Sequence, residues 1–546
     1  MHPGEFVPSI ADSLEPLADR VSVGFDAVSR DRDPRPFQPL GAVAGLFALY
    51  LVLVAWLDVV RRLPQSSYDQ PVILFEIVLQ SGKYLLLLLI AAVALRTRTL
   101  LQSWSTFDLP GPLRAFTFVT AFVAAWPYTT YDYNLFYGQG HDVDRIVVML
   151  LAAGVLWRPV FVLPLLVALG AMLWQFWHPM EQYPWSHVNL PYRALILIAA
   201  AHLYHGIRGR FPSANLFFLV FCLVATHYWW GGLAKLWIGW VTHGQIWLMT
   251  LNAYANGWLA FLGTEAIVAY AKAAAPFDVP IRAGTVVLEV FVLACLWRRR
   301  VLLFFLAGWF LFHLGIFAMT GMFFWIWMVM EACLFVIVWR LKTPGALPIF
   351  SLRYFVISAL LIGSARLWAG PPNLTWFDTP FCYTYRFHAI GVSGKAHPLA
   401  NPDFEPYTPQ FVLGYFRYIH DRPQLVHIWG ATQNREIAKA LRRADSVEAI
   451  YLLEEQKSWK KLEPARRDRF DAFFRRFIAN LNRRRTGEHW LRPIQAPAHL
   501  WSYPKEAPFE WTEPIERIVV YRISTYFDGE RYEEVRREKV HEIDVR

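Results

Sequence analysis

The sequence predicts an all-α polytopic membrane bundle of about eleven transmembrane helices, followed by a small α+β domain on the extracytoplasmic side. Three observations predict this fold class. Of the 546 residues, 55% are hydrophobic and 18% are charged, which is too apolar for a typical soluble protein of this length. Long apolar runs recur as far as residue 368, with basic residues at alternate joints between them. Beyond residue 370 the runs stop and ordinary globular patterning begins.

This pattern divides the chain into three segments. Residues 1–40 are polar and contain no apolar signal-peptide core, so we expect a cytoplasmic N-terminal segment and a first span that itself starts insertion. Residues 41–368 form the predicted transmembrane domain. Residues 369–546 form the predicted extracytoplasmic α+β domain, with Pro371 and Pro372 at its boundary.

The individual spans follow from the thickness of the bilayer. A hydrocarbon core of about 30 Å needs about 20 apolar residues per helix, because every backbone polar group in lipid must be satisfied within the helix. We therefore expect spans near residues 41–60, 73–95, 112–128, 143–157, 159–177, 189–206, 213–238, 280–297, 301–320, 322–339 and 349–368.

The charge of the joints predicts the orientation of the bundle. The joints at 129–142 and 178–188 contain no Lys or Arg, whereas the alternate joints are basic, so the positive-inside rule makes the basic joints cytoplasmic. Arg61 and Arg62 after the first span depart from this pattern. We expect everything after Trp368 to lie outside a bacterial inner or plasma membrane. The basic joints carry Arg96, Arg98, Arg114, Arg158, Arg208, Arg210, Arg298 to Arg300, Arg340 and Lys342.

The formal charge of +10 does not indicate a nucleic-acid partner, because the basic residues lie at the ends of apolar runs and in the last third of the chain. No disulfide framework is expected, since three of the four cysteines are embedded in apolar runs. Cys382 alone falls in a predicted aqueous segment.

The C-terminal domain combines strands and helices. Phe381 to Phe387 is predicted to form a strand, and 517–527 with 531–540 to form a β-hairpin with a type I′ turn at Asp528-Gly529. Between them, apolar residues from Phe470 to Leu481 recur at helical spacing. This stripe is typical of a helix that faces a core, and the alternative is a surface that docks anionic headgroups or an acidic peptide.

Ionisable residues within the spans are candidate site residues, because such groups are costly in lipid unless they find a partner or a cavity. The richest cluster lies between Thr226 and Trp240, where His227, Gly231 and Lys235 are spaced by four along one helix face. Gly231 and Gly232 permit close approach of a flat ligand or of another helix. The alternative for Lys235 is an ammonium that snorkels to the interface among tryptophans.

Two further polar groups lie on the same predicted side. One runs from Tyr131 to Asn134 and from Gly140 to Arg145, and includes His141, which is otherwise only a polar residue in the first turn of a helix. The other comprises His178, Glu181 and His187. Their convergence under a globular domain predicts an active site in the membrane. These residues lack the spacing of a zinc signature, so no metal is predicted.

The segment Tyr228 to Gly244 resembles the vitamin K-dependent γ-glutamyl carboxylases and their bacterial relatives, the horizontally transferred transmembrane domain family. The matching residues are Gly232, Lys235, Leu236, Trp240, Val241 and Gly244. The resemblance implies that Lys235 is the catalytic base. It also implies that His141, which follows Gly140 ahead of an apolar run, is the essential histidine of an earlier helix.

The resemblance extends to the layout of the chain, with many helices followed by a domain that opens with the aromatic strand at Tyr383 to Phe387 and continues through residues 403–407. The family pattern has a second lysine and acidic residues where this chain has Ala234, Trp237 and Gly239. The C-terminal domain is also shorter than that of the animal enzymes. The chemistry of the quinol therefore transfers more readily than recognition of a protein substrate.

In the family reaction, a reduced naphthoquinone reacts with O2 to give a base that removes a γ-proton from glutamate, which then adds CO2. The resemblance thus implies a lipidic quinol drawn from the membrane lipid, and a peptide or protein substrate on the extracytoplasmic side. We expect His227, Trp230, Gly231 and Gly232 to bind the cofactor, and His141 to hydrogen-bond to the developing anion. Lys235 must be neutral when it acts, and burial favours the neutral amine.

A non-catalytic alternative is a membrane scaffold or transporter with a partner-binding extracytoplasmic domain. Transporters usually place their charges near the bilayer midplane and show internal repeats. Here the polar clusters gather at one face without a visible repeat, which favours the enzyme. A lipid transferase would require a stronger nucleophile signal than His141-Asp142 provides.

Overall fold

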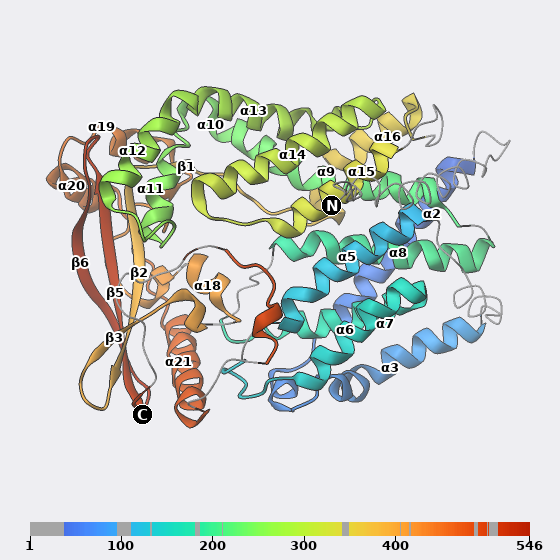
Figure 1. Ribbon diagram of the computed structural model, residues 1–546, viewed down its shortest axis with the longest axis horizontal. Coiled ribbons are helices and arrows are strands. Elements are labelled where there is room, and N and C mark those ends of the chain that lie inside the picture. Colours follow the sequence, from blue (N-terminus) through green and yellow to red (C-terminus); the bar gives the residue numbers. More distant parts are fainter. Residues whose placement is uncertain are drawn as a thin grey trace, which may run out of the picture.

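A computed structural model gives the architecture of the chain (Figure 1). The predicted N-terminal segment up to residue 37 and the basic joints at 95–110 and 341–348 lie outside the described residues. The structure describes residues 38–94, 111–130, 134–180, 186–209, 211–340, 349–404, 406–413, 416–484, 490–499, 501 and 512–546.

Each of the predicted apolar runs forms a helix over most of its length, as expected for apolar segments that must satisfy their own backbone hydrogen bonds. Gly239 ends α9 and Gly321 ends α14, both with the left-handed φ that suits glycine. The helices are α2 (Gln38–Val60), α3 (Ile73–Ala94), α5 (Gly111–Thr130), α6 (Asp142–Trp157), α7 (Val162–Trp174), α8 (Ser186–Arg208), α9 (Ser213–Ile238), α13 (Asp278–Val290), α14 (Arg299–Thr320), α15 (Trp325–Arg340), α16 (Leu352–Gly363) and α17 (Ala365–Trp368), with 3-10 turns η1 (Gln65–Asp69), η2 (Pro159–Phe161), η3 (Ala275–Phe277) and η4 (Phe291–Ala294).

Three segments of the described chain are helices long and apolar enough to cross a membrane: Leu40–Val60, Ser213–Ile238 and Arg299–Thr320. The count of about eleven spans stays a prediction. Of these three, α9 is central, because 83% of its most apolar window is buried against 28% for each of the other two. It packs against α2, α8, α13 and α16. A helix that is apolar all round is expected in such a position.

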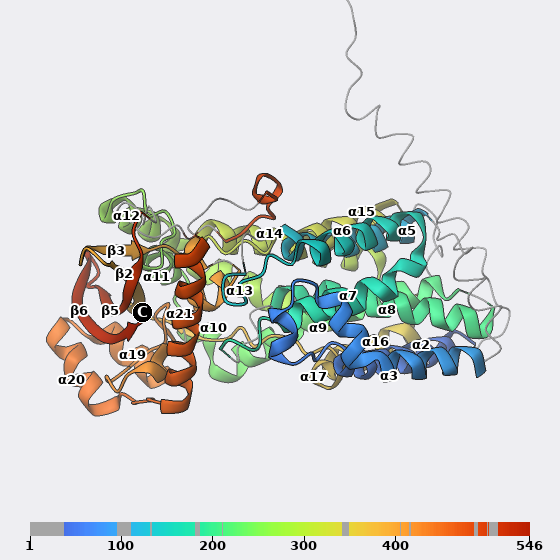
Figure 2. The same ribbon diagram turned by 90° about the horizontal axis from the view of Figure 1, so that it is seen from below.

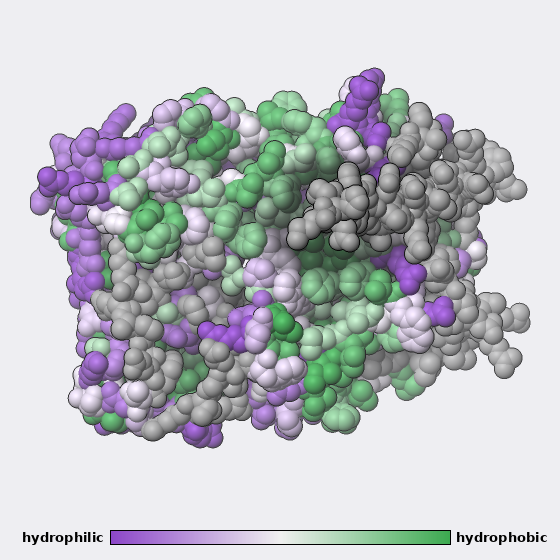
Figure 3. All heavy atoms as spheres, in the orientation of Figure 1, coloured by the Kyte–Doolittle hydropathy of each residue, from purple (hydrophilic) through white to green (hydrophobic). Residues whose placement is uncertain are grey.

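The outer surface of the bundle is apolar. Phe75 and Leu79 of α3 are 70% and 73% exposed, and Leu311 of α14 is 63% exposed. In Figure 3, hydrophobic residues cover much of the visible bundle, whereas hydrophilic residues line the outer edge of the C-terminal domain. Large exposed apolar areas of this kind indicate contact with lipid or with another protein.

Arg61 and Arg62, which depart from the positive-inside pattern, form ion pairs with Asp58. Their guanidinium groups also lie 5.6 and 5.3 Å from the centre of the Trp174 ring. The local carboxylate and the ring therefore offset much of their charge.

The C-terminal domain lies at one end of the bundle (Figures 1 and 2). Its four-stranded antiparallel sheet has the order β3-β2-β5-β6, and β1 pairs with β4. The predicted strand and hairpin are confirmed. The elements are β1 (Phe377–Asp378), β2 (Phe381–Gly391), β3 (Ala396–Leu399), η5 (Asn401–Phe404), α18 (Thr408–Leu413), η6 (Phe416–Ile419), β4 (Ala431–Thr432), α19 (Arg435–Arg443), α20 (Val447–Lys457), α21 (Pro464–Arg484), η7 (Arg492–Ile494), β5 (Ile515–Phe527) and β6 (Tyr532–Asp544).

The predicted type I′ turn is wrong. A type I′ turn needs positive φ at both central residues, and of the pair Asp528-Gly529 only Gly529 has it. The last strand pair is Phe527 with Tyr532, so the loop is longer than two residues. The Asp528 carboxylate accepts hydrogen bonds from the backbone N–H groups of Glu530 and Arg531, which stabilises the longer loop.

The aromatic stripe of α21 faces the core, as predicted. Phe470, Phe473, Phe474 and Phe477 are at most 1% exposed. Apolar packing continues from the domain into the bundle, where Phe473 stacks on Phe136 with ring centres 5.5 Å apart.

The short helices α10 (Trp240–His243), α11 (Leu248–Ala255) and α12 (Thr264–Ala274) were not predicted. They lie between the bundle and the sheet, and α11 contacts β2 while α12 contacts β6. Cys382 on β2 is buried in this contact, although its segment was predicted to be aqueous.

Candidate functional site

Lys235 lies in the last turn of α9 and is paired with a buried carboxylate. Its Nζ donates hydrogen bonds to both carboxylate oxygens of Glu289 on α13, each at 2.7 Å. The two side chains are only 10% and 6% exposed. The interfacial, snorkelling alternative for Lys235 is therefore wrong, because snorkelling requires the ammonium to reach water.

Gly232 allows this pair to form. A Cβ atom at Gly232 would lie 2.7 Å from the Cβ of Glu289 and 2.9 Å from its carbonyl carbon. Only glycine lets the backbones of α9 and α13 approach so closely. The neighbour that occupies the space beside Gly232 is thus another helix.

The residues after α9 in the matched segment, from Trp240 to Gly244, also contact Lys235 or α13. Trp240 is buried, and its ring centre lies 5.7 Å from the Lys235 ammonium. The carbonyl of Val241 accepts a hydrogen bond from Arg282 of α13. A Cβ atom at Gly244 would lie 2.8 Å from the Cδ of Arg282, so this glycine also serves close approach.

Arg282 forms a second buried ion pair on α13. It contacts Asp278 at 2.7 Å, and each side chain is 10% exposed. Asp278 also accepts a hydrogen bond from the backbone N–H of Ile246 at 2.7 Å. Helix α13 is therefore attached to the end of α9 by the Lys235–Glu289 ion pair. It is attached to the segment after α9 by the hydrogen bonds that Arg282 and Asp278 form with the backbone of Val241 and Ile246.

The C-terminal domain covers this region. Thr375 donates a hydrogen bond to the carbonyl of Gly231 at 3.3 Å. Arg442 of α19 donates to the carbonyl oxygens of His243 and of Asp378. Burial raises the pKa of Asp378 well above its ordinary value. The Lys235–Glu289 pair thus lies at the contact between the bundle and the C-terminal domain.

The other predicted cofactor residues on α9 face different neighbours. His227 packs edge-on against Trp327 of α15, with ring centres 5.3 Å apart, and its Nδ1 lies 2.9 Å from the carbonyl of Leu223. Its buried Nε2 has no hydrogen-bond partner among the described residues. Trp230 instead contacts Arg366 of α17, whose guanidinium carbon lies over the ring, 4.5 Å from the ring centre.

His141 precedes α6 and has a left-handed backbone, with φ 53°. Such a conformation costs a residue other than glycine free energy and is held by its surroundings. The ring is buried, and its Nδ1 lies 3.6 Å from the Asp144 carboxylate. Asp144 in turn accepts hydrogen bonds from the backbone N–H groups of Ile73 and Leu74 at the start of α3.

The structure does not join His141 to Lys235 by a contact. Within the described part of the chain, the polar partner of the His141 ring is on α6, whereas the partner of Lys235 is on α13. Both ring nitrogens of His141 are buried without a hydrogen bond to a described residue. A site shared by the two side chains stays a prediction.

The third predicted polar group is described only in part. His178 lies 3.0 Å through Nε2 from the carbonyl of Leu63 and packs against Tyr68. Glu181 and the side chain of His187 lie outside the described residues, as do residues 131–133. In the described ranges, no group of three or more His, Cys, Asp or Glu side chains is placed to hold a metal ion.

Sequence reasoning did not single out Glu289, His313 or Glu331. All three are ionisable residues inside predicted spans, so the rule that flagged Lys235 would also have flagged them. Glu331 hydrogen-bonds to Tyr228, and its other oxygen lies 3.3 Å from His313.

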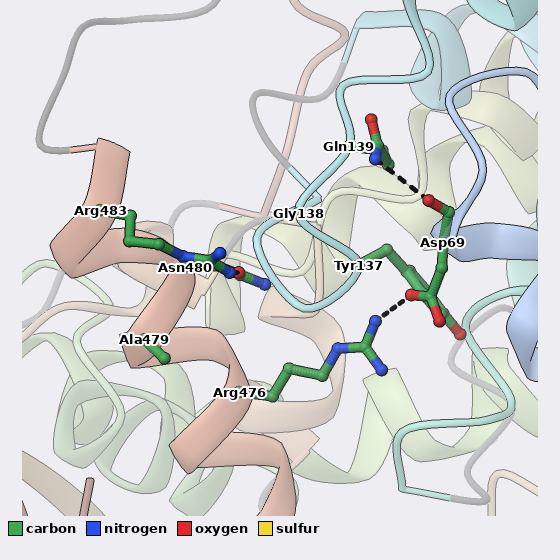
Figure 4. A pocket seen from close by; sticks show the side chains of 8 residues that line it. All are labelled: Asp69, Tyr137, Gly138, Gln139, Arg476, Ala479, Asn480 and Arg483. Carbon is green, nitrogen blue, oxygen red and sulfur yellow. Dashed lines mark hydrogen bonds and ion pairs between the residues drawn. The ribbon is translucent and has the colours of Figure 1, made fainter. Parts of the chain in front are cut away.

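A pocket of 440 Å³ lies elsewhere, between α21 and the loop before α6 (Figure 4). Arg476 enters it from α21 and forms an ion pair with Asp69. Gln139 donates a hydrogen bond to the carbonyl of Asp69 at 3.0 Å. None of the site residues predicted from the sequence lines this pocket.

Comparisons with protein-family models, with curated proteins and with solved structures found no match to this chain.

Gly232→Ala should lower the thermal unfolding midpoint of the detergent-solubilised protein. The added methyl group overlaps the backbone of α13, and overpacking of this kind costs about 1–3 kcal/mol. Gly284→Ala is the matched control, because Gly284 lies on α13 with open space around its position. An equal effect of both substitutions would contradict the close approach at Gly232.

Lys235→Met should also destabilise the fold, since it leaves the Glu289 carboxylate buried without its partner, at a cost of about 3–5 kcal/mol. Lys235→Met combined with Glu289→Gln should recover most of this loss, because no charge stays unpaired. The measurement is the unfolding midpoint of each variant at one pH. A double variant as unstable as the single one would show that the pair does not govern stability.

Proposed function

We propose that this chain is a membrane-embedded, quinol-dependent enzyme similar to the vitamin K-dependent γ-glutamyl carboxylases, with Lys235 as its base. One observation carries the proposal. Gly232, Trp240 and Gly244, which match the family pattern, are also the residues that surround Lys235 or hold α13 against it. The match therefore coincides with a buried, oriented lysine.

A buried lysine can serve as a base only in its neutral form. Pairing with Glu289 favours the ammonium, whereas burial disfavours both charges. The pair has no net charge whether the shared proton lies on Nζ or on the carboxylate. Lys235 is thus neutral when Glu289 holds the proton, and it can then accept a proton from a quinol hydroxyl group.

A bound reduced naphthoquinone would supply, together with O2, the strong base that removes a γ-proton from a glutamate before CO2 adds. The residues of this chain contribute orientation and proton transfer. Trp240 presents its ring to the ammonium, and Thr375 of the C-terminal domain covers the adjacent turn. Such coverage excludes water and strengthens electrostatic interactions within the site.

The proposed orientation places the N-terminus in the cytoplasm and the C-terminal domain outside. The exposed apolar side chains on the outside of the bundle and the three long apolar helices support insertion in a membrane. The basic joints support the sidedness: Arg114 caps the carbonyl of Leu156 at the end of α6, and Arg299 caps those of Val338 and Trp339 at the end of α15.

A protease-cleavable tag after Arg546 tests this orientation. In intact spheroplasts, added protease should remove the tag, while a cytoplasmic marker protein stays intact. Cys382 is unsuitable for thiol labelling because it is buried. Protection of the tag until the membrane is permeabilised would place the domain in the cytoplasm and overturn the proposed topology.

Oxygen consumption with reduced naphthoquinone tests the enzyme. Lys235→Met combined with Glu289→Gln should lower turnover about 10²–10⁴-fold, the range that general-base catalysis supplies. Arg282→Met combined with Asp278→Asn is the matched control, because it removes the other buried ion pair of α13 but leaves Lys235 and Glu289 in place. It should lower turnover much less than the loss of Lys235 and Glu289. Equal losses in two well-folded variants would make the role of Lys235 structural.

Mass spectrometry of quinones that co-purify with the protein, before and after reduction and exposure to oxygen, identifies the cofactor.

The alternative of a transporter or scaffold is favoured by one observation, the second buried carboxylate at Glu331. If the parent consumes neither quinol nor oxygen, this alternative replaces the enzyme.

A further inference from the structure

Three helices bring a tyrosine, a histidine and a carboxylate together inside the bundle. The hydroxyl of Tyr228 on α9 donates a hydrogen bond to one oxygen of Glu331 on α15. The other oxygen lies 3.3 Å from Nδ1 of His313 on α14. Tyr228, Glu331 and His313 are 2%, 0% and 2% exposed, so the carboxylate is buried away from the surface.

Aromatic rings hold this triad in place. The Tyr228 ring stacks on Trp309, with ring centres 4.4 Å apart and planes inclined by 3°. Trp309 donates a hydrogen bond at 3.1 Å to the carbonyl of Leu288, the residue before Glu289. Trp327 packs against His313 with ring centres 5.5 Å apart. The triad is therefore surrounded by aromatic rings and is linked to α13 through Trp309.

On α9, the triad residue Tyr228 lies on the same face as Lys235 and two turns nearer the start of the helix. Tyr228, Gly232 and Lys235 follow one another at spacings of four and three residues, which align along a helix. With a rise of 1.5 Å per residue, the two clusters are about 10 Å apart along the axis. Tyr228 and His313 each interact electrostatically with Glu289.

The charges of the combined set do not balance. With Lys235 as an ammonium, Glu289 and Glu331 as carboxylates and His313 neutral, the set carries one net negative charge. Within the described chain, Glu331 has two titratable side chains within hydrogen-bonding or ion-pair distance, Tyr228 from α9 and His313 from α14. Helix α15 also packs against α5 and α8. A net charge without solvent or a counterion is costly.

We propose that Tyr228, His313 and Glu331 form a buried site that holds one exchangeable proton and thereby sets the charge state of Lys235. The bound proton is shared between Glu331 and His313 and removes the net negative charge. When the site holds this proton, no unpaired carboxylate favours the ammonium, and Lys235 can pass its own proton to Glu289. No electrons move: the site exchanges its one proton with the aqueous phase, and the proton that leaves Lys235 arrives on Glu289.

Infrared spectroscopy of the solubilised protein tests the proton site without any substrate. The parent should show C=O absorption from a buried, protonated carboxyl group that titrates with pH. Glu331→Gln should remove the band. Tyr228→Phe should shift it, because the group loses a hydrogen bond.

Tyr354→Phe is the matched control, since Tyr354 donates to Asn215 at 2.7 Å in another buried part of the bundle. It should leave the band unchanged. If Glu331→Gln does not fold, the test rests on Tyr228→Phe. A parent spectrum without a titrating carboxyl band, or a band that neither Glu331→Gln nor Tyr228→Phe alters, overturns the proposal.

The link to catalysis rests on the proposed function and has a separate readout. Tyr228→Phe should shift the pH profile of quinol-dependent oxygen consumption, and Tyr354→Phe should not. An unchanged profile in Tyr228→Phe would overturn the control of Lys235. A titrating Glu331 band in a protein that consumes no quinol would leave the proton site standing and refute only the proposed reaction.

Discussion

The ion pair between Lys235 and Glu289 is the constraint on which the rest of this region depends. Two charges taken out of water are stable only when they are close and well hydrogen-bonded. Glu289 meets this condition with both oxygens 2.7 Å from Nζ. That distance requires α13 to lie directly on α9, which in turn requires a glycine at position 232. The covalent sequence around Lys235 is thus shaped by a partner 54 residues away.

The C-terminal domain contacts the backbone next to this pair. Thr375 donates a hydrogen bond to the carbonyl of Gly231 on α9, and Arg442 donates to the carbonyl of His243. His243 is the last residue of α10, where a backbone carbonyl lacks a partner within the helix and normally reaches water. The sheet itself is supported by α11 and α12, which contact β2 and β6. The domain therefore forms part of the surroundings of Lys235 and packs against the bundle.

The helices could be predicted because long apolar runs must form helices in lipid, whatever their neighbours are. The hairpin was equally visible from the alternation around Asp528-Gly529. Its turn type was not, because the Asp528 side chain caps two N–H groups and extends the loop. The segment between Trp240 and Ala274 has no long apolar run, so its pattern did not predict the three short helices that it forms.

The site was only half visible for a different reason. Spacing along one helix identified the face of α9 that carries Lys235, but it cannot reveal what packs against that face. The burial of Lys235 and the identity of its partner are tertiary facts. An ionisable residue within an apolar run marks a candidate site residue, and this signal is present at Glu289, Glu331 and His313. It identifies each residue separately and does not show which of them are in contact. What connects them is the meeting of α9, α13, α14 and α15, which the sequence does not encode locally.

Packing of α13 on α9 does not by itself require an ion pair between Lys235 and Glu289. Apolar residues of similar volume often stabilise a buried position as well as an ion pair does, so a chain that only had to dock α13 could use them. The second pair on α13 offers a contrast: the Arg282 guanidinium cannot lose its proton, and it also holds the carbonyl of Val241. Arg282 is therefore suited to structure. Among the described residues, Lys235 donates hydrogen bonds only to Glu289 and to no backbone carbonyl, and a lysine amine, unlike a guanidinium, is a side chain that can act as a base. This difference between two neighbouring pairs is the main physical argument for the proposal that Lys235 acts as a base.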